Sequence, residues 1–152
     1  MKPAAWRLVI TAVLFAGWIG YLGYLVAATR NSIVLSRPQF LVSGLDVIAT
    51  RKGDDSFLVD EVLYPADKNE EWRGKTIVVR NLKACQIFYS DRSGGVPVPA
   101  DEDRKYLLPL DIEEGANARV VPTPPSPGYK TGPPRIYPFD TAVLNEYRTV
   151  PK

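Results

Sequence analysis

The sequence predicts a small all-β domain, a barrel of five or six strands, with one transmembrane helix before it and an extended proline-rich tail after it. Three observations support this prediction. The segment from Leu8 to Ala28 is apolar and carries no charged residue. The middle of the chain consists of short runs rich in β-branched and aromatic residues, separated by turn residues. The segment from Val121 to Pro138 ("VPTPPSPGYKTGPPRIYP") is so rich in proline that it can form neither a helix nor a central strand.

The uncharged segment from Leu8 to Ala28 is long enough to span a membrane. A helix of this length covers roughly 30 Å, which is the thickness of the hydrocarbon core of a bilayer. A cleaved secretory signal has a shorter apolar centre, although the small residues Val26-Ala27-Ala28 would suit cleavage after Ala28. We therefore expect an uncleaved anchor, and removal after Ala28 is the alternative.

The charges on either side of this segment bear on its orientation. Lys2 and Arg7 precede it, and Arg30 and Arg37 follow it, so the positive-inside rule discriminates only when the amino terminus is counted with the first pair. The short leading tail and the export-like apolar segment favour the same arrangement. We expect residues 1–7 in the cytoplasm, the span at 8–28, a linker at 29–38 and the remaining domain outside the cytoplasm.

One face of the predicted span carries small residues. Rows of small residues let two membrane helices approach closely, so we expect this face to pack against a partner helix or a second copy of the chain. The other interpretation is that glycine and alanine are simply common in spanning helices. The candidate helix-packing residues are Ala12, Ala16, Gly20, Gly23 and Ala27.

Residues 39–121 are expected to form the β-barrel. Apolar residues alternate along several of the runs, which is the pattern of strands that present one face to a core. The predicted strands are Gln39–Thr50, Ser56–Tyr64, Lys75–Leu82, Gln86–Ser90, Lys105–Leu110 and Ala118–Val121.

The connections between these runs carry turn signals. Arg51–Asp55 ("RKGDD") predicts a hairpin turn, and Gly44 inside the first run predicts a bulge or bend. Pro65–Gly74 is a polar connection for which we expect one helical turn before Trp72. Pro109 has no N–H to donate, so its strand is expected to lie at an edge or to be bulged.

Residues 122–152 are the predicted tail. Its aromatic and aliphatic side chains are too numerous for a disordered linker, so we expect them to pack on the barrel or on another subunit. Asp140 is expected to cap a short helical turn at Thr141–Tyr147. The candidate partner-binding residues are Tyr129, Arg135, Ile136, Tyr137 and Phe139.

The residue composition argues against several kinds of chemistry. The chain has no histidine and one cysteine, Cys85, which we expect to be a small half-buried side chain, with a reactive or intermolecular thiol as the alternative. Without histidine there is no Ser-His-Asp triad, no Cys/His zinc site and no His-ligated haem. The carboxylates lack the spacing of a calcium loop. We therefore predict a protein that is not an enzyme and has no catalytic, cofactor-binding or metal-binding residues.

The distribution of charge argues against nucleic acid as a partner. The formal net charge of +2 comes from Lys2 and Arg7, and the chain beyond them is neutral. Acidic residues outnumber basic ones from Asp46 to Glu114, whereas basic residues predominate from Gly115 to Lys152. This asymmetry predicts that the tail lies on the domain.

The order of these elements resembles a known class of domain. A long bent first strand with Gly44, a hairpin into "FLVDEVLY", then "GKTIVVRNL", a variable loop and "KYLLPL" with a further short strand look like bacterial exported OB-fold-like domains, including the netrin/TIMP type. The whole chain is similar to uncharacterised single-pass bacterial membrane proteins that end in a "PPRIYP" segment. The haem chaperone of cytochrome c maturation has the same layout, but this chain lacks the histidine that such a chaperone uses.

These observations predict a non-enzymatic single-pass membrane protein of the cell membrane. Its extracytoplasmic domain and proline-rich tail are expected to bind or brace other envelope or membrane-complex proteins, with the lipid bilayer and possible copies of itself as further partners. The alternative is an extracytoplasmic small-ligand-binding or carrier domain that uses Trp72, Tyr106 and the loop Asp91–Lys105.

Overall fold

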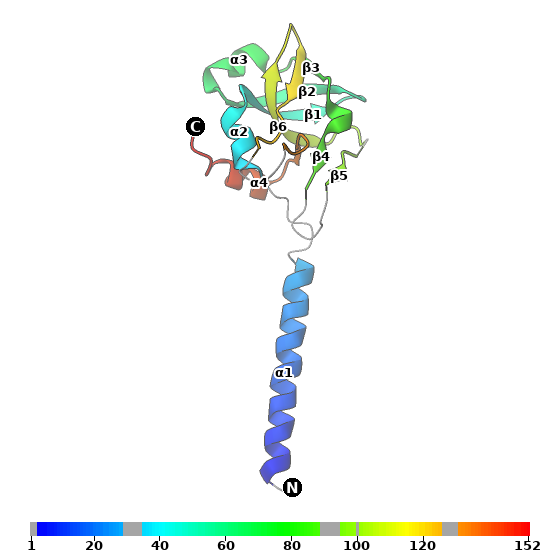
Figure 1. Ribbon diagram of the computed structural model, residues 1–152, viewed down its shortest axis with the longest axis vertical. Coiled ribbons are helices and arrows are strands. Elements are labelled where there is room, and N and C mark those ends of the chain that lie inside the picture. The colour runs from blue at the N-terminus through cyan, green and yellow to red at the C-terminus, as the bar shows by residue number, and fades with distance from the viewer. Residues whose placement is uncertain (1–2, 29–34, 89–94, 100, 126–130) are drawn as a thin grey trace. The chain divides into compact units, whose positions relative to one another are not determined.

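A computed structural model describes residues 3–28, 35–88, 95–99, 101–125 and 131–152 (Figure 1). The chain divides into two compact units, Met1–Ser32 and Ile33–Lys152. The first unit contains one helix. The second is a β-domain that includes the segment predicted as the tail.

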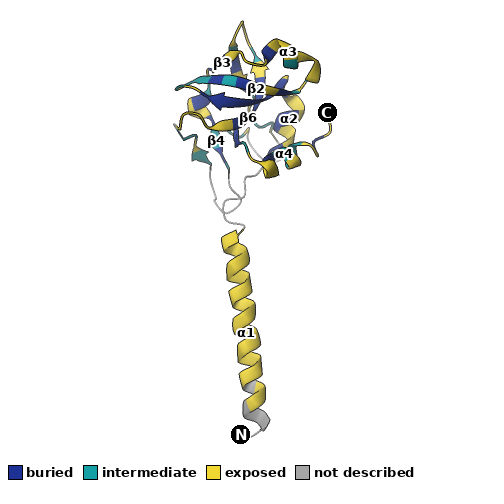
Figure 2. Cartoon of the chain, turned by 180° about the vertical axis from the view of Figure 1, so that it is seen from behind, coloured by how far each residue is buried: buried dark blue, intermediate teal, exposed yellow. Residues whose placement is uncertain are grey.

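The first unit is helix α1, Pro3–Ala28. The segment Val9–Ala28 of this helix is long enough and apolar enough to cross a membrane, and none of it is buried. Figure 2 shows the exposure along α1. The predicted N-terminal apolar helix is therefore confirmed, and it is compatible with either a signal anchor or a signal sequence.

The second unit is built on a barrel of five strands. Strand order runs β1-β2-β3-β7-β6, and β6 pairs with β1 to close the barrel. β3 and β7 are parallel, whereas the other neighbours are antiparallel, so the barrel is mixed. The five strands are β1 Leu45–Arg51, β2 Ser56–Tyr64, β3 Thr76–Val79, β6 Lys105–Ile112 and β7 Asn117–Val120.

Shorter elements connect and cover the barrel. β8 adds a further antiparallel pairing to β6, while β4 and β5 form a separate two-stranded sheet. The helical turn expected before Trp72 is present as η1 and α3. These elements are η1 Ala66–Lys68, α3 Asn69–Trp72, η2 Leu82–Ala84, β4 Gln86–Ile87, β5 Val96–Pro97 and β8 Tyr137–Pro138.

The first predicted strand, Gln39–Thr50, is wrong in its first part. Residues Arg37–Val42 form helix α2, with Pro38 in the first turn, where its missing N–H costs no hydrogen bond. Gly44 precedes strand β1 and donates its N–H to the Leu110 carbonyl, 3.0 Å away. The irregularities of β1 fall later, in its register with β2 after Asp46 and after Ile48.

The prediction that Pro109 lies at an edge or a bulge is also corrected. β6 is a central strand, paired with β1 on one side and with both β8 and β7 on the other. The Pro109 carbonyl accepts from the Val121 N–H at 3.0 Å. The nitrogen of Pro109 faces the same side of β6 as its carbonyl. It lies between the β6 residues that pair with β8 and those that pair with β7. No N–H is needed there because the partner strand changes at this point.

The barrel encloses the larger of two apolar clusters. Alternate residues of the strands point inward, as the sequence pattern predicts, and most are fully buried. Side chains from the later connections complete this cluster. Its largest fully buried members are Leu45, Phe57, Ile77, Ile87, Tyr106, Leu108, Leu110 and Ile136.

The second cluster lies outside the barrel and holds the C-terminal residues. α2, the outer faces of β1 and β6, β8 and helix α4 (Thr141–Tyr147) all contribute to it. The predicted cap of α4 is confirmed, since Asp140 Oδ1 accepts from the Val143 N–H at 2.8 Å. The described part of the predicted extended tail therefore packs as part of the β-domain. The buried members are Leu35, Phe40, Ile48, Leu107, Tyr137, Val143 and Val150.

Candidate functional site

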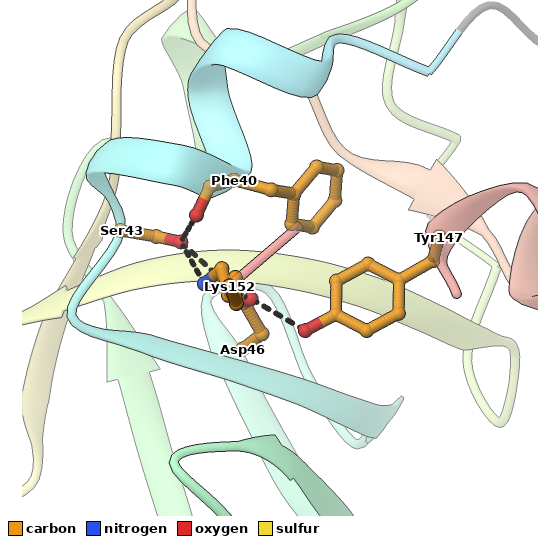
Figure 3. Close-up of polar contacts among 5 residues, drawn as sticks. All are labelled: Phe40, Ser43, Asp46, Tyr147 and Lys152. Atoms are coloured by element: carbon orange, nitrogen blue, oxygen red, sulfur yellow. Dashed lines mark hydrogen bonds and ion pairs between the residues drawn. The ribbon is translucent and has the colours of Figure 1, made fainter. Parts of the chain in front are cut away.

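Asp46 is a fully buried carboxylate on the outer side of β1 (Figure 3). It accepts hydrogen bonds from the Tyr147 hydroxyl at 2.7 Å, from the Ser43 hydroxyl and from the Lys152 ammonium group. Lys152 also forms an ion pair with it, and the side chain of Lys152 is only 12% exposed. We call Ser43, Asp46, Tyr147 and Lys152 the polar lock, because they join the C-terminal residues to β1.

The neighbours of Asp46 act on its pKa in opposite directions. Burial raises the pKa above the ordinary value of 3.8, whereas the bonds from Lys152, Ser43 and Tyr147 lower it, and burial is the larger effect. Burial also raises the pKa of the Tyr147 hydroxyl, and the Asp46 carboxylate adds to that rise. The ammonium group of Lys152 lies 4.0 Å from the centre of the Tyr64 ring, a cation–π contact.

The polar lock places a serine beside a lysine, a pair that can perform nucleophilic catalysis. Lys152 Nζ lies 3.1 Å from Ser43 Oγ. A lysine base must be neutral, however, and the Lys152 ammonium group is engaged in an ion pair with buried Asp46. The Ser43 hydroxyl has one proton, which the Phe40 carbonyl at 2.8 Å and Asp46 both attract. The contacts of these residues attach the C-terminal segment to β1.

A cavity of about 350 Å³ lies beside the turn between β1 and β2. Arg51 lines it and is itself buried, with 6% of its surface exposed. Its Nε donates to the Gly53 carbonyl at 3.0 Å and its Nη2 to the Asp54 carbonyl at 2.7 Å. Its Nη1 donates to the Pro99 carbonyl. The lining residues are Arg51, Asp54, Asp55, Leu82, Lys83, Pro97 and Val98.

The sequence predicts Arg51 only as the first residue of the hairpin turn Arg51–Asp55. An arginine at the end of a strand, directly before "KGDD", is usually solvated. No local sequence signal indicates its burial, which the structure shows as part of β1, all seven residues of which are buried. The partner that shows its role, Pro99, lies 48 positions away in the chain.

A second cavity, of about 480 Å³, lies between β2, α3 and the start of β6. Two carboxylates, Asp60 and Glu61, line it, and Asp60 accepts from the Thr50 hydroxyl at 2.6 Å and lies 3.4 Å from the Lys105 ammonium group. Within the described residues, no group of three or more His, Cys, Asp or Glu side chains is placed to hold a metal ion.

The candidate helix-packing residues lie on α1, where Ala12, Ala16, Gly20, Gly23 and Ala27 are all exposed. A Cβ atom added to Gly20 or Gly23 would meet no atom within 4 Å. A side chain can therefore replace either glycine without its Cβ atom contacting another part of the described chain.

The candidate partner-binding residues have different environments. Ile136 and Tyr137 are fully buried in the β-domain, so they pack on the domain itself, one of the two expected arrangements. Phe139 is half-buried against the second apolar cluster. The Arg135 guanidinium lies 4.0 Å from the centre of the Phe88 ring. Tyr129 lies outside the described residues.

Two of the residues expected to bind a small ligand belong to the core. Trp72 is 8% exposed and Tyr106 is fully buried, so neither offers a surface to a ligand. Pro97 and Val98, from the loop Asp91–Lys105, do line the first cavity. Cys85 is free and is buried rather than half-buried, and burial raises the pKa of its thiol to about 12.

The fold and these sites define a small mixed β-barrel domain that follows an N-terminal apolar helix. Comparisons with protein-family models, curated proteins and solved structures found no match, so no family is assigned.

Proposed function

We propose that this is a non-enzymatic single-pass membrane protein whose α1 remains in the membrane and whose β-domain binds or braces other envelope proteins outside the cytoplasm. The observation that carries the proposal is the exposed apolar surface of Val9–Ala28. Exposed apolar surface costs about 25 cal/mol per Å² in water, so lipid or another helix must cover it. The amino terminus, counted together with Lys2 and Arg7 before the span, supports the orientation.

The β-domain is best described as OB-like. A five-stranded barrel in which the third strand pairs in parallel with the last, and the first pairs with the fourth, has the strand order of that fold. β1, β2, β3, β6 and β7 take these places here. OB folds support many binding functions, so the fold agrees with a binding role without specifying the ligand.

The surface that we assign to partners differs from the predicted tail residues. Ile136 and Tyr137 are buried, whereas Leu41 and Val42 on α2 are 54% and 57% exposed. The polar lock fixes the C-terminal segment to β1 beside α2. We therefore assign contact with partner proteins to the small-residue face of α1 and to the exposed end of α2.

The test enlarges the small-residue face with Ala16→Leu and Gly20→Leu in the full-length protein. We expect proteins that co-purify in mild detergent, or a second copy, to be lost or strongly depleted, because bulk on this face keeps helices apart. Pull-down followed by mass spectrometry measures this. Leu14→Phe, on the opposite side of the helix, is the control and should have no effect.

Two results would contradict this proposal. A native protein that is recovered only as a free monomer would have no partner to brace. A mature amino terminus at residue 29 would show that the apolar segment is a cleaved signal, and the membrane role of α1 would be withdrawn.

The second candidate function is a small-ligand carrier. The specific observation in its favour is the cavity beside the β1–β2 turn, which lies within the size range of ligand sites. Native mass spectrometry of the purified full-length protein tests it. A retained small molecule would support a carrier, and its absence after gentle extraction would count against one.

A further inference from the structure

Arg51 is a buried cation whose hydrogen-bond acceptors in the described chain are all neutral carbonyl groups. Its three nitrogen atoms donate to three backbone carbonyls, and no carboxylate of the described residues forms an ion pair with it. A guanidinium carries five N–H groups, so two of them are not used by these bonds. Buried charges in proteins are normally paired, because an isolated charge is costly to remove from water. A cavity bordered by such a group can accept the missing anion.

The other charged residues of this cavity make a purely anionic ligand unfavourable. Asp54 and Asp55 line the cavity together with Lys83, and none of these three forms an ion pair within the described part of the chain. Both signs of charge are therefore available at one site. An anion alone would be repelled by the two carboxylates, and a cation alone would leave Arg51 without a counter-ion.

The remaining lining is apolar, and the cavity is small. Leu82, Pro97 and Val98 supply aliphatic surface between the charged groups. A volume of about 350 Å³ is at the lower end of the range for ligand sites, which suits a molecule no larger than a single amino acid.

We propose that this cavity binds a small zwitterion of the amino-acid type. The ligand carboxylate lies toward Arg51 and Lys83, its ammonium group toward Asp54 and Asp55, and a short aliphatic side chain against Leu82 and Val98. This inference rests on the second proposed function, the carrier role, and is independent of the bracing role of α1.

The test titrates the full-length protein in detergent with three probes and measures binding by calorimetry. L-leucine carries both charges and an aliphatic side chain, propionate carries only the carboxylate, and isobutylamine only the ammonium group. We expect leucine to bind, and each single-charge probe to bind at least roughly tenfold more weakly, because it lacks a hydrogen bond to a charged group and, in propionate, the branched side chain as well.

Two variants test the named residues without disturbing Arg51, which also holds the turn. Lys83→Gln and Asp55→Asn remove one charge each at nearly constant volume, and each should weaken leucine binding by roughly tenfold. Lys68→Gln and Glu70→Gln, exposed residues outside the cavity, are the matched controls and should bind as the native protein does.

Several outcomes would overturn the proposal. Leucine that does not bind, propionate that binds as tightly as leucine, or binding unchanged by Lys83→Gln and Asp55→Asn would each contradict a zwitterion site. If native mass spectrometry still finds a retained molecule without both charges, the carrier function stands and only the ligand class fails. If neither method finds binding, the carrier function fails as well.

Discussion

At the scale of single residues, the buried carboxylate of Asp46 gives the β-domain a pH dependence of unusual sign. Its pKa is raised in the folded state, so its contribution to stability is complete below pH 3.8 and is lost as the pH rises through the folded-state pKa. Lys152 limits this loss, because its ammonium group favours the ionised carboxylate.

Lys152→Met should therefore destabilise the domain at neutral pH more than in acid. We expect a loss of about 3 kcal/mol near pH 7, as for a broken buried ion pair, and a much smaller loss below pH 3.8, where Asp46 is protonated in both states. Urea unfolding of the full-length protein at the two pH values measures the difference. Lys68→Met, at an exposed site, is the control. Equal losses at both pH values would show that Asp46 is not the group that Lys152 stabilises.

At the scale of elements, local sequence explains why α4 is a helix but does not explain why α2 is one. Asp140 precedes α4 and caps it through its own side chain, a signal that lies within four residues of chain. α2 has no side-chain cap hydrogen bond, and its residues Phe40 to Val42 also suit a strand. The helix forms there because Phe40 packs against Tyr137 and Tyr147, with ring centres 5.3 and 5.1 Å away.

Asp140→Ala tests how far α4 supports the second apolar cluster. The change removes the cap of the Val143 N–H, so we expect a loss of about 1 kcal/mol and a lower melting temperature. Thermal unfolding followed by circular dichroism measures this. Asp140→Asn, which retains a capping oxygen, should lose much less, and an equally large loss would mean that the charge rather than the cap is responsible.

At the scale of the whole molecule, β1, β2, β3, β7 and β6 close the barrel without a strand from the C-terminal segment. The residues after Pro138 contribute to the second cluster and to the polar lock. The described part of the β-domain thus has a closed barrel and a separate outer layer that the C-terminal segment completes.

Deletion of residues 139–152 should leave a β-rich but less stable domain. The closed barrel retains its strands, whereas Phe40, Ile48 and Leu107 lose their cover and bind a hydrophobic dye such as ANS. Circular dichroism and dye fluorescence measure the two effects. Complete loss of β-structure would show that the barrel does not form without the outer layer.

Much of the barrel could be predicted from the sequence, because its signals are local. Ser56–Tyr64 was predicted with the bounds that β2 has, and the alternation of buried residues there and in β3 follows the period of a strand. Gln86–Ser90 is predicted in the same way; its described part contains strand β4, Gln86–Ile87, which lies outside the barrel, and residues 89–90 lie outside the described residues. Pairing of so short a strand depends on its neighbours rather than on its own residues.

The candidate sites could not be predicted, because their members are far apart in the chain. Tyr147 reaches Asp46 across 101 positions, and Lys152 reaches it across 106. No local pattern indicates that an aspartate at the start of a strand will lose all contact with water. The charge asymmetry did predict that the basic C-terminal part lies on the acidic domain, since long-range attraction between opposite charges depends little on exact geometry.

Local sequence is enough to predict the apolar N-terminal helix, most of the strands and the capped helix α4, because each depends on the periodicity, charge or capping of neighbouring residues. Long-range packing is what makes Arg37–Val42 helical, makes Ile136 and Tyr137 core residues, and buries Asp46 and Arg51 with their partners. These outcomes depend on barrel closure, which brings distant residues together and removes water from between them.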